Sequence, residues 1–151
     1  MAAFLHESGP AAVVYSVDVD AAWRTTWASL RGFVGSRRCD IEIVRDKDAW
    51  RLNGVPVKSI SHLADLDLSF TPATNVLQLK RAGPRIGETV SLPAAWFNLD
   101  DGALTELPQS YARLDDTRYR YAAPSVPYEG VLEVGGDGFI ADYPGLWRRE
   151  G

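Results

Sequence analysis

Three side chains that could take part in acid–base or metal chemistry lie close together in the sequence: His62, Asp65 and Asp67. Side chains alternate between the two faces of a β-strand, so Asp65 and Asp67 would share one face and His62 would lie on the other. Two carboxylates on one face could act in general acid–base catalysis, and with His62 they could bind a metal. The opposite placement of His62 argues against the metal site. The simpler interpretation, which we favour, is a solvated polar face or carboxylates paired with arginine from a neighbouring strand.

A polar segment, Thr71–Asn75, follows directly and contains Pro72. Proline fixes the backbone φ angle, and threonine and asparagine side chains bond nearby backbone groups, so the segment is typical of a turn. The chain then continues into the apolar run Val76–Arg81, which we expect to be a strand. A structural turn between two strands explains this segment, and a polar cluster at the mouth of a pocket is the functional alternative.

Aromatic residues are the second feature that points to a binding role, because the chain has five tryptophans and six tyrosines. Each tryptophan can bury a large area while its N–H keeps a polar partner, and for any single one core packing is the expected role. As a set they suit a β cavity or groove that contacts an acyl chain or the face of a sugar. The tryptophans are Trp23, Trp27, Trp50, Trp96 and Trp147.

Several classes of site are excluded by what the sequence lacks. Two histidines and one cysteine are too few for a Cys/His zinc site. A hydrolase triad is not excluded, but no serine stands in a Gly-x-Ser-x-Gly context. No glycine cluster has the pattern of a phosphate-binding loop, so the sequence predicts no cofactor and no metal. The net charge of −4 argues against nucleic-acid binding, and there is no basic stretch for an anionic membrane.

The elements that must position these residues are mainly strands, because the dominant pattern has a period of two. Apolar and polar residues alternate over Arg37–Arg45, Arg118–Tyr121 and Tyr128–Val134. Cys39 lies on the apolar face of the first of these segments, which predicts a buried core cysteine. The segment Ala21–Leu30 fits a helix as well as a strand, and its threonines and tryptophans favour the strand.

Turn residues separate the predicted strands at the short intervals expected of an all-β domain. The pair Asn53-Gly54 predicts a tight hairpin, since both residues readily adopt positive φ angles. Further turns are predicted at Asp46–Asp48, Asp100–Gly102, Asp115-Asp116 and Gly135–Gly138.

With 151 residues the chain has the length of one domain. It has no signal-peptide pattern and no apolar run long enough to span a membrane, so we expect a cytoplasmic protein.

Four segments in order along the chain carry a resemblance to a known family. The first is Asp65-Leu66-Asp67-Leu68-Ser69-Phe70-Thr71-Pro72-Ala73-Thr74-Asn75, followed by Leu77 and Arg81, and the others are Leu107–Tyr111, Tyr119–Tyr121 and Asp137–Arg149. From about Tyr15 onward the sequence resembles the putative glycolipid-binding family of bacterial proteins. Four ordered motifs are more specific than any one of them.

The resemblance implies an all-β fold with little helix. This would be a curled antiparallel sheet, or spiral β-roll, similar to the half-barrels of bacterial lipoprotein carriers. It also implies binding of a glycolipid or another lipid-like molecule on the concave face. Relative to that family, the single domain of residues 1–151 is expected to be short at its N-terminus. A sheet without its opening strands would have an open edge, through which two copies could pair as a homodimer.

The resemblance also sharpens the expectation for the two aspartates. If they are buried they need arginine or hydroxyl partners, and a hairpin around Pro72 would bring Arg81 and Thr74 close to them. We therefore predict an Asp–Arg–Thr/Asn polar cluster at one end of the roll, which either holds the turn or contacts a ligand headgroup. The full set of predicted ligand-binding residues is Trp27, Asp65, Asp67, Thr74, Asn75, Arg81, Gln109 and Tyr111.

Non-catalytic binding of a lipid-like or glycolipid ligand is the leading functional hypothesis, with no catalytic residues and no stable membrane insertion. Two alternatives stay open. A protein-interaction module would use the open sheet edge or an aromatic face. A small hydrolase or isomerase would use Asp65 and Asp67, and its sign would be a strongly raised pKa of one carboxylate within a cleft.

Overall fold

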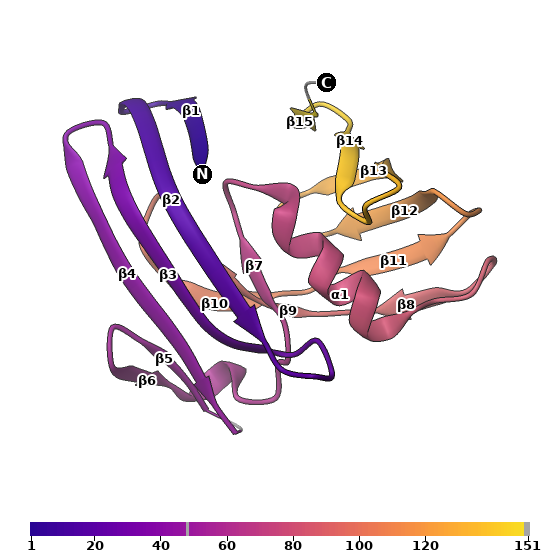
Figure 1. Ribbon diagram of the computed structural model, residues 1–151, viewed down its shortest axis with the longest axis horizontal. Coiled ribbons are helices and arrows are strands. Elements are labelled where there is room, and N and C mark those ends of the chain that lie inside the picture. The colour runs from indigo at the N-terminus through magenta and orange to yellow at the C-terminus, as the bar shows by residue number, and fades with distance from the viewer. Residues whose placement is uncertain (48, 150–151) are drawn as a thin grey trace. The chain divides into compact units, whose positions relative to one another are not determined.

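The computed structural model describes residues 1–47 and 49–149. The chain divides into two compact units, Met1–His62 and Leu63–Gly151, and Figure 1 shows the elements of each. Both units are built mainly from antiparallel strands, so the predicted all-β class with little helix is confirmed. The spiral arrangement of a complete roll stays a prediction.

The first unit, over its described residues, is a six-stranded antiparallel sheet in which each strand pairs with the next one along the chain (Figure 1). The outer strands β1 and β6 form its two edges, and the homodimer through an open edge stays a prediction. The elements of this unit are β1 (Ala2–His6), β2 (Gly9–Val19), β3 (Thr25–Val34), β4 (Arg37–Asp46), β5 (Ala49–Leu52), β6 (Val55–Val57) and the short 3₁₀-helix η1 (Lys58–Ile60).

The strands of the first unit bury alternate residues, as a half-buried sheet requires. Val13, Leu30 and Ile43 are completely buried, and Cys39 is buried as predicted. The segment Ala21–Leu30 enters β3 at Thr25, so the strand interpretation is confirmed from that residue onward.

Two tight backbone features shape this sheet. Asn53 and Gly54 have φ angles of 48° and 79° and form the predicted turn between β5 and β6. A Cβ atom at Gly32 in β3 would collide with the backbone oxygen of Ala12 in β2, so the close pairing of these strands requires glycine. The predicted turn at Asp46–Asp48 includes Asp48, which lies outside the described residues.

The second unit contains two sheets with a helical segment between β7 and β8 (Figure 1). The smaller sheet has the order β10-β9-β7, in which β7 and β9 are parallel, and the larger has the order β15-β14-β13-β12-β11-β8. The elements are β7 (Leu66–Leu68), the 3₁₀-helix η2 (Pro72–Thr74), α1 (Asn75–Ala82), β8 (Thr89–Ser91), β9 (Ala94–Phe97), β10 (Leu104–Leu107), β11 (Ser110–Arg113), β12 (Arg118–Ala123), β13 (Tyr128–Val134), β14 (Ile140–Tyr143) and β15 (Trp147–Arg148).

The predicted strand at Val76–Arg81 is wrong, because this segment forms the helix α1. The Thr71 side chain accepts a hydrogen bond from the Ala73 N–H, and Pro72 opens the first helical turn, so the polar segment starts a helix. The residues from Leu77 to Ala82 are good helix formers, and Gly83 ends the helix in the left-handed conformation with a φ of 53°. The predicted hairpin around Pro72 is therefore wrong as well.

Tyrosines form much of the core of the second unit. Tyr119 and Tyr121 point inward from β12 while Arg118 and Arg120 are exposed, which confirms the predicted alternation on this strand. The tyrosines pack in one cluster with leucines from α1, β10 and β13. The predicted turns at Asp100–Gly102, Asp115-Asp116 and Gly135–Gly138 all join strands that pair with each other.

Candidate functional site

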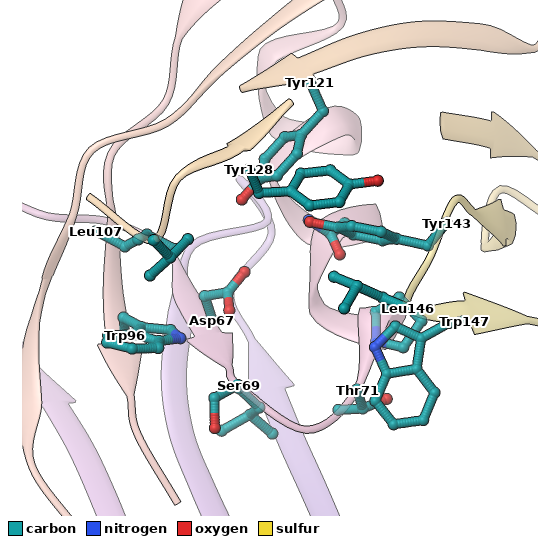
Figure 2. Close-up of a pocket in the computed structure, with 14 residues that line it drawn as sticks. Asp67, Ser69, Thr71, Trp96, Leu107, Tyr121, Tyr128, Tyr143, Leu146 and Trp147 are labelled. Atoms are coloured by element: carbon teal, nitrogen blue, oxygen red, sulfur yellow. The ribbon is translucent and has the colours of Figure 1, made fainter. Parts of the chain in front are cut away.

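A cavity of about 270 Å³ lies in the second unit. Its walls come from β7, from the segment that leads into α1, and from strands of both sheets (Figure 2). Ser69, Val126 and Leu146 line it and are exposed, so the cavity is in contact with solvent on their side. The lining therefore combines residues that are far apart in the sequence and that the folding of this unit brings together.

Asp67 is the carboxylic acid of this cavity. It lies in the middle of β7 between Leu66 and Leu68, is 8% exposed, and points into the cavity (Figure 2). Burial raises the pKa of Asp67 to about 7, because the ionised form is poorly solvated there. Within the described residues, no group donates a hydrogen bond to this carboxyl. Asp67 is thus a largely buried carboxyl that keeps contact with the cavity and lacks a hydrogen-bond partner among the described residues.

Aromatic rings surround Asp67. The rings of Tyr121, Tyr128 and Tyr143 pack on one another, with centroid separations between 4.9 and 5.9 Å. Burial raises the pKa of Tyr121 and Tyr143, so these hydroxyls stay neutral; the negative charge of Asp67 adds to this shift for Tyr121, and the interaction with Tyr121 adds to it for Tyr143. The aromatic lining residues are Trp96 on β9, Tyr121 on β12, Tyr128 on β13, Tyr143 on β14 and Trp147 on β15 (Figure 2).

A buried chain of hydrogen bonds connects two lining residues, Asn75 and Tyr121, through side chains behind the cavity wall. Asn75 Nδ2 donates to the Tyr111 hydroxyl at 2.6 Å, and that hydroxyl donates to Gln78 Oε1 at 2.8 Å. Gln109 Nε2 donates to the same Gln78 oxygen at 2.7 Å, and the Tyr121 hydroxyl donates to Gln109 Oε1 at 2.6 Å. Because Asn75 and Gln78 are three residues apart on α1, they face the same strands. The helix thereby fixes the Tyr121 ring beside the cavity.

Asp65 has a different environment although it is only two residues from Asp67. The Arg81 guanidinium donates to both carboxylate oxygens, with Nη2 to Oδ2 at 2.7 Å and Nε to Oδ1 at 2.9 Å. Asp65 is completely buried and the Arg81 side chain is 28% exposed. Hydrogen bonding to Asp65 raises the pKa of Arg81. Neither residue lines the cavity, so this ion pair serves the packing of α1 against the β7 segment.

Comparison with known proteins identifies the family. The sequence pattern of the putative glycolipid-binding family matches residues 1–149. The chain belongs to the putative glycolipid-binding family. A crystal structure of a DUF1089 family protein from Pseudomonas aeruginosa is similar, with a TM-score of 0.85 and 25% sequence identity, over 95% of this chain and 80% of that one. No curated protein matches the chain.

Two of the predicted ligand-binding residues of this glycolipid-binding family member line the cavity, Asp67 and Asn75. Gln109 and Tyr111 lie behind its wall in the hydrogen-bond chain, and Thr74 accepts a hydrogen bond from the Leu68 N–H at 3.2 Å. The predicted pairing of an aspartate with an arginine is confirmed. The prediction of a single Asp–Arg–Thr/Asn cluster is wrong. Arg81 pairs with Asp65, whereas the Thr74 hydroxyl accepts from the backbone of β7 and the Asn75 amide donates to a tyrosine.

Two predicted features lie elsewhere in the chain. Trp27 is on β3 of the first unit, where its Nε1 donates to Glu42 Oε1 at 3.2 Å. His62 is exposed, and the described residues contain no group of three or more side chains that could hold a metal. No helix of the described part is long and apolar enough to cross a bilayer. The ligand-binding roles of the predicted residues stay predictions.

Sequence reasoning missed most of the cavity wall. The five aromatic lining residues were visible only as part of a general excess of tryptophan and tyrosine. The sequence feature that comes nearest to identifying a lining residue is the alternation of arginine and tyrosine on β12, which predicts that Tyr121 points inward. No local pattern shows that Trp96 and Trp147, which are 51 positions apart in the sequence, line the same cavity.

Proposed function

We propose that this protein binds a lipid-like or glycolipid molecule without transforming it, and that the cavity around Asp67 receives the headgroup. The observation that carries the proposal is a buried carboxyl group with no hydrogen-bond partner among the described residues, aimed into a cavity with aromatic walls. A buried polar group without a partner destabilises a protein, and a ligand that donates to it would remove that cost.

The composition of the cavity suits a sugar-like headgroup. Hydroxyl groups can donate to Asp67, and the faces of aromatic rings such as Trp96 and Trp147 can pack against the C–H side of a ring. The volume of about 270 Å³ is just below the range of roughly 300–1,000 Å³ that is usual for drug-sized ligands. A headgroup would fill such a space, and an acyl chain would need additional surface.

Apolar side chains at the solvent side offer part of that surface. Val126 is 38% exposed and Leu146 is 58% exposed, and both line the cavity. Such side chains would contact the apolar part of the ligand where it leaves the cavity. The arrangement therefore matches an amphipathic molecule, with its polar end at Asp67 and its apolar end near Leu146.

An enzyme is the second candidate, because a carboxyl with a pKa of about 7 in a cavity is what a general acid or base requires. The predicted partner carboxylate does not support this function, since Asp65 is paired with Arg81 and does not line the cavity. Among the described lining residues there is no histidine, lysine or cysteine to share the proton transfers. Only hydroxyl groups, such as those of Ser69, Thr71 and Tyr143, could share these steps with Asp67, so we retain the binding function.

Native mass spectrometry of the full chain purified from its own host, with a lipid extract of the same sample, tests the proposal. We expect a lipid-like or glycolipid molecule to co-purify in a fixed ratio and to stay chemically unchanged on incubation with the protein. Conversion of the bound molecule into a new product would contradict the non-catalytic part of the proposal.

A pair of tryptophan variants then tests whether the ligand binds in this cavity. Trp147→Ala removes a wall of the cavity, and we expect it to weaken binding of the co-purified molecule by about tenfold, which corresponds to about 1.4 kcal/mol. Trp23→Ala, which changes an exposed tryptophan of the first unit that does not line the cavity, is the matched control and should leave the affinity unchanged. Equal loss of affinity in both variants, or loss only in Trp23→Ala, would place the ligand outside this cavity.

A further inference from the structure

The charges that face the cavity restrict which headgroup it can bind. The inference drawn from them rests on the proposed binding function. Asp67 is the acidic side chain of the lining, and the described lining residues include no lysine, arginine or histidine. The arginine of the neighbouring segment, Arg81, is committed to Asp65 at 2.7 Å. A phosphate, sulfate or carboxylate headgroup would therefore meet a carboxylate without a counter-ion. An anionic ligand is disfavoured, and neutral or cationic groups remain.

The hydrogen bonds that the tyrosine hydroxyls already make restrict the chemistry of the headgroup further. The Tyr121 hydroxyl donates its proton to Gln109 Oε1 at 2.6 Å, and the Tyr128 hydroxyl donates to the backbone oxygen of Pro144 at 2.8 Å. These hydroxyls can therefore offer only lone pairs to a ligand. Together with the two oxygens of Asp67 they make the aromatic part of the cavity rich in acceptors. A group with several donors and a positive charge matches this arrangement best.

We propose that the headgroup carries a protonated primary amine, as in an amino-substituted sugar or an amino-alcohol lipid, which donates to the Asp67 carboxylate between the aromatic rings. The rings of Trp96, Tyr143 and Trp147 surround the carboxyl in Figure 2, and aromatic faces attract cations in addition. The indole N–H groups of the two tryptophans remain as donors for hydroxyl oxygens next to the amine. The primary amine is preferred over a quaternary one, because only the former can donate a hydrogen bond to the carboxylate.

The ionisation of Asp67 gives this inference a pH signature. The ammonium needs the ionised carboxylate, and burial raises the pKa of Asp67 to about 7. The other titratable groups around it are Tyr111, Tyr121, Tyr128 and Tyr143, whose pKa values burial raises above 10, so they stay neutral. The affinity for the amine should fall about tenfold for each pH unit below 7. A neutral sugar has no such requirement.

The test uses isothermal titration calorimetry of the full chain with three probes that share one sugar ring. Ethyl β-D-glucoside is neutral, 2-aminoethyl β-D-glucoside carries a primary amine that is protonated through pH 8, and the trimethylammonio analogue carries the charge without donors. At pH 8 we expect the primary amine to bind at least about tenfold more tightly than the other two, and this advantage to disappear by pH 5.5. Ethanolamine without sugar distinguishes an amino-alcohol headgroup from an amino-substituted sugar.

Variants connect the preference to the carboxylate. Asp67→Asn should remove the difference between the amine and the neutral probe, and Glu129→Gln, an exposed carboxylate on β13 that does not line the cavity, should preserve it. Equal affinity of the two probes for the wild-type protein at pH 8, or an amine preference that survives in Asp67→Asn, would overturn the inference and leave the proposed function intact. Failure of all probes and of the host lipid extract to bind would overturn both.

Discussion

The substitution Asp67→Asn should make the protein more stable at neutral and alkaline pH. Asparagine has nearly the shape of the protonated carboxyl but cannot ionise, so it occupies the same place in β7 without a buried charge. Asp67 is 8% exposed and has no hydrogen-bond donor among the described residues. The wild-type protein therefore has to bury an unpaired carboxylate at high pH, and the variant does not.

The size and sign of the effect follow from proton linkage. The pKa of Asp67 is 3.8 in an unperturbed chain and about 7 in the folded protein. Between these values the folded state binds more protons than the unfolded state, so the stability of the wild-type protein falls as the pH rises from about 4 to 7. At about 1.36 kcal/mol for each pKa unit, the whole loss is on the order of 4 kcal/mol. The variant should lack this loss.

Urea denaturation of both proteins at pH 5, 6, 7 and 8 measures the effect. Exposed carboxylates such as Asp115 and Asp137, whose pKa values are lowered by hydrogen bonds, have the opposite trend, but they cancel in the difference between the two proteins. We expect the variant's midpoint to exceed that of the wild type by at least about 1 M urea at pH 8, and this excess to fall to less than half at pH 5, where only part of the loss has developed. Glu129→Gln should show no such change. A difference between Asp67→Asn and wild type that does not vary with pH would refute the reasoning.

Three further substitutions test the surroundings of the cavity. Arg81→Ala leaves the buried Asp65 carboxylate unpaired, so the free energy of unfolding should fall by about 3–5 kcal/mol in urea titrations while the folded protein keeps its ligand affinity; a weaker affinity would restore the headgroup role of the arginine. Tyr111→Phe removes a hydroxyl that both accepts and donates, and thermal or urea unfolding should show a loss of about 1–3 kcal/mol. In Gly130→Ala the new Cβ would lie 2.5 Å from the hydroxyl of the tyrosine two residues earlier, so calorimetry should show weaker ligand binding, whereas Gly136→Ala, in open space, should match the wild type.

The strands were predictable because each sheet has a buried and an exposed side. On β12, tyrosines and arginines alternate in the sequence and then lie on opposite sides in the structure. The turn at Asn53-Gly54 was predictable for a different reason, since few residues tolerate its positive φ angles. In both cases a local physical requirement fixes the structure without information from distant parts of the chain.

Helix α1 could not be predicted from periodicity, because the apolar run Val76–Arg81 is too short to distinguish the two periods. The residues that indicate a helix lie at its two ends, where Thr71 and Pro72 start a helical turn and Gly83 ends the helix. The error mattered for the site. A helix presents Asn75 to the cavity and directs Arg81 to Asp65, whereas a strand would have sent both towards one cluster.

The two aspartates of the β7 segment show why a ligand explains the cavity better than packing does. Both are buried, and a buried carboxylate requires a counter-ion or donors. Asp65 obtains them from Arg81, so the chain was able to provide a partner at this place in the fold. Asp67, two residues away, faces a cavity and receives none from the described residues, although an apolar residue would suit its neighbours Leu66 and Leu68. A buried carboxyl that lowers the stability of the fold, and that lacks a partner only where it faces a cavity, is typical of a functional site. The ligand would then supply the missing partner.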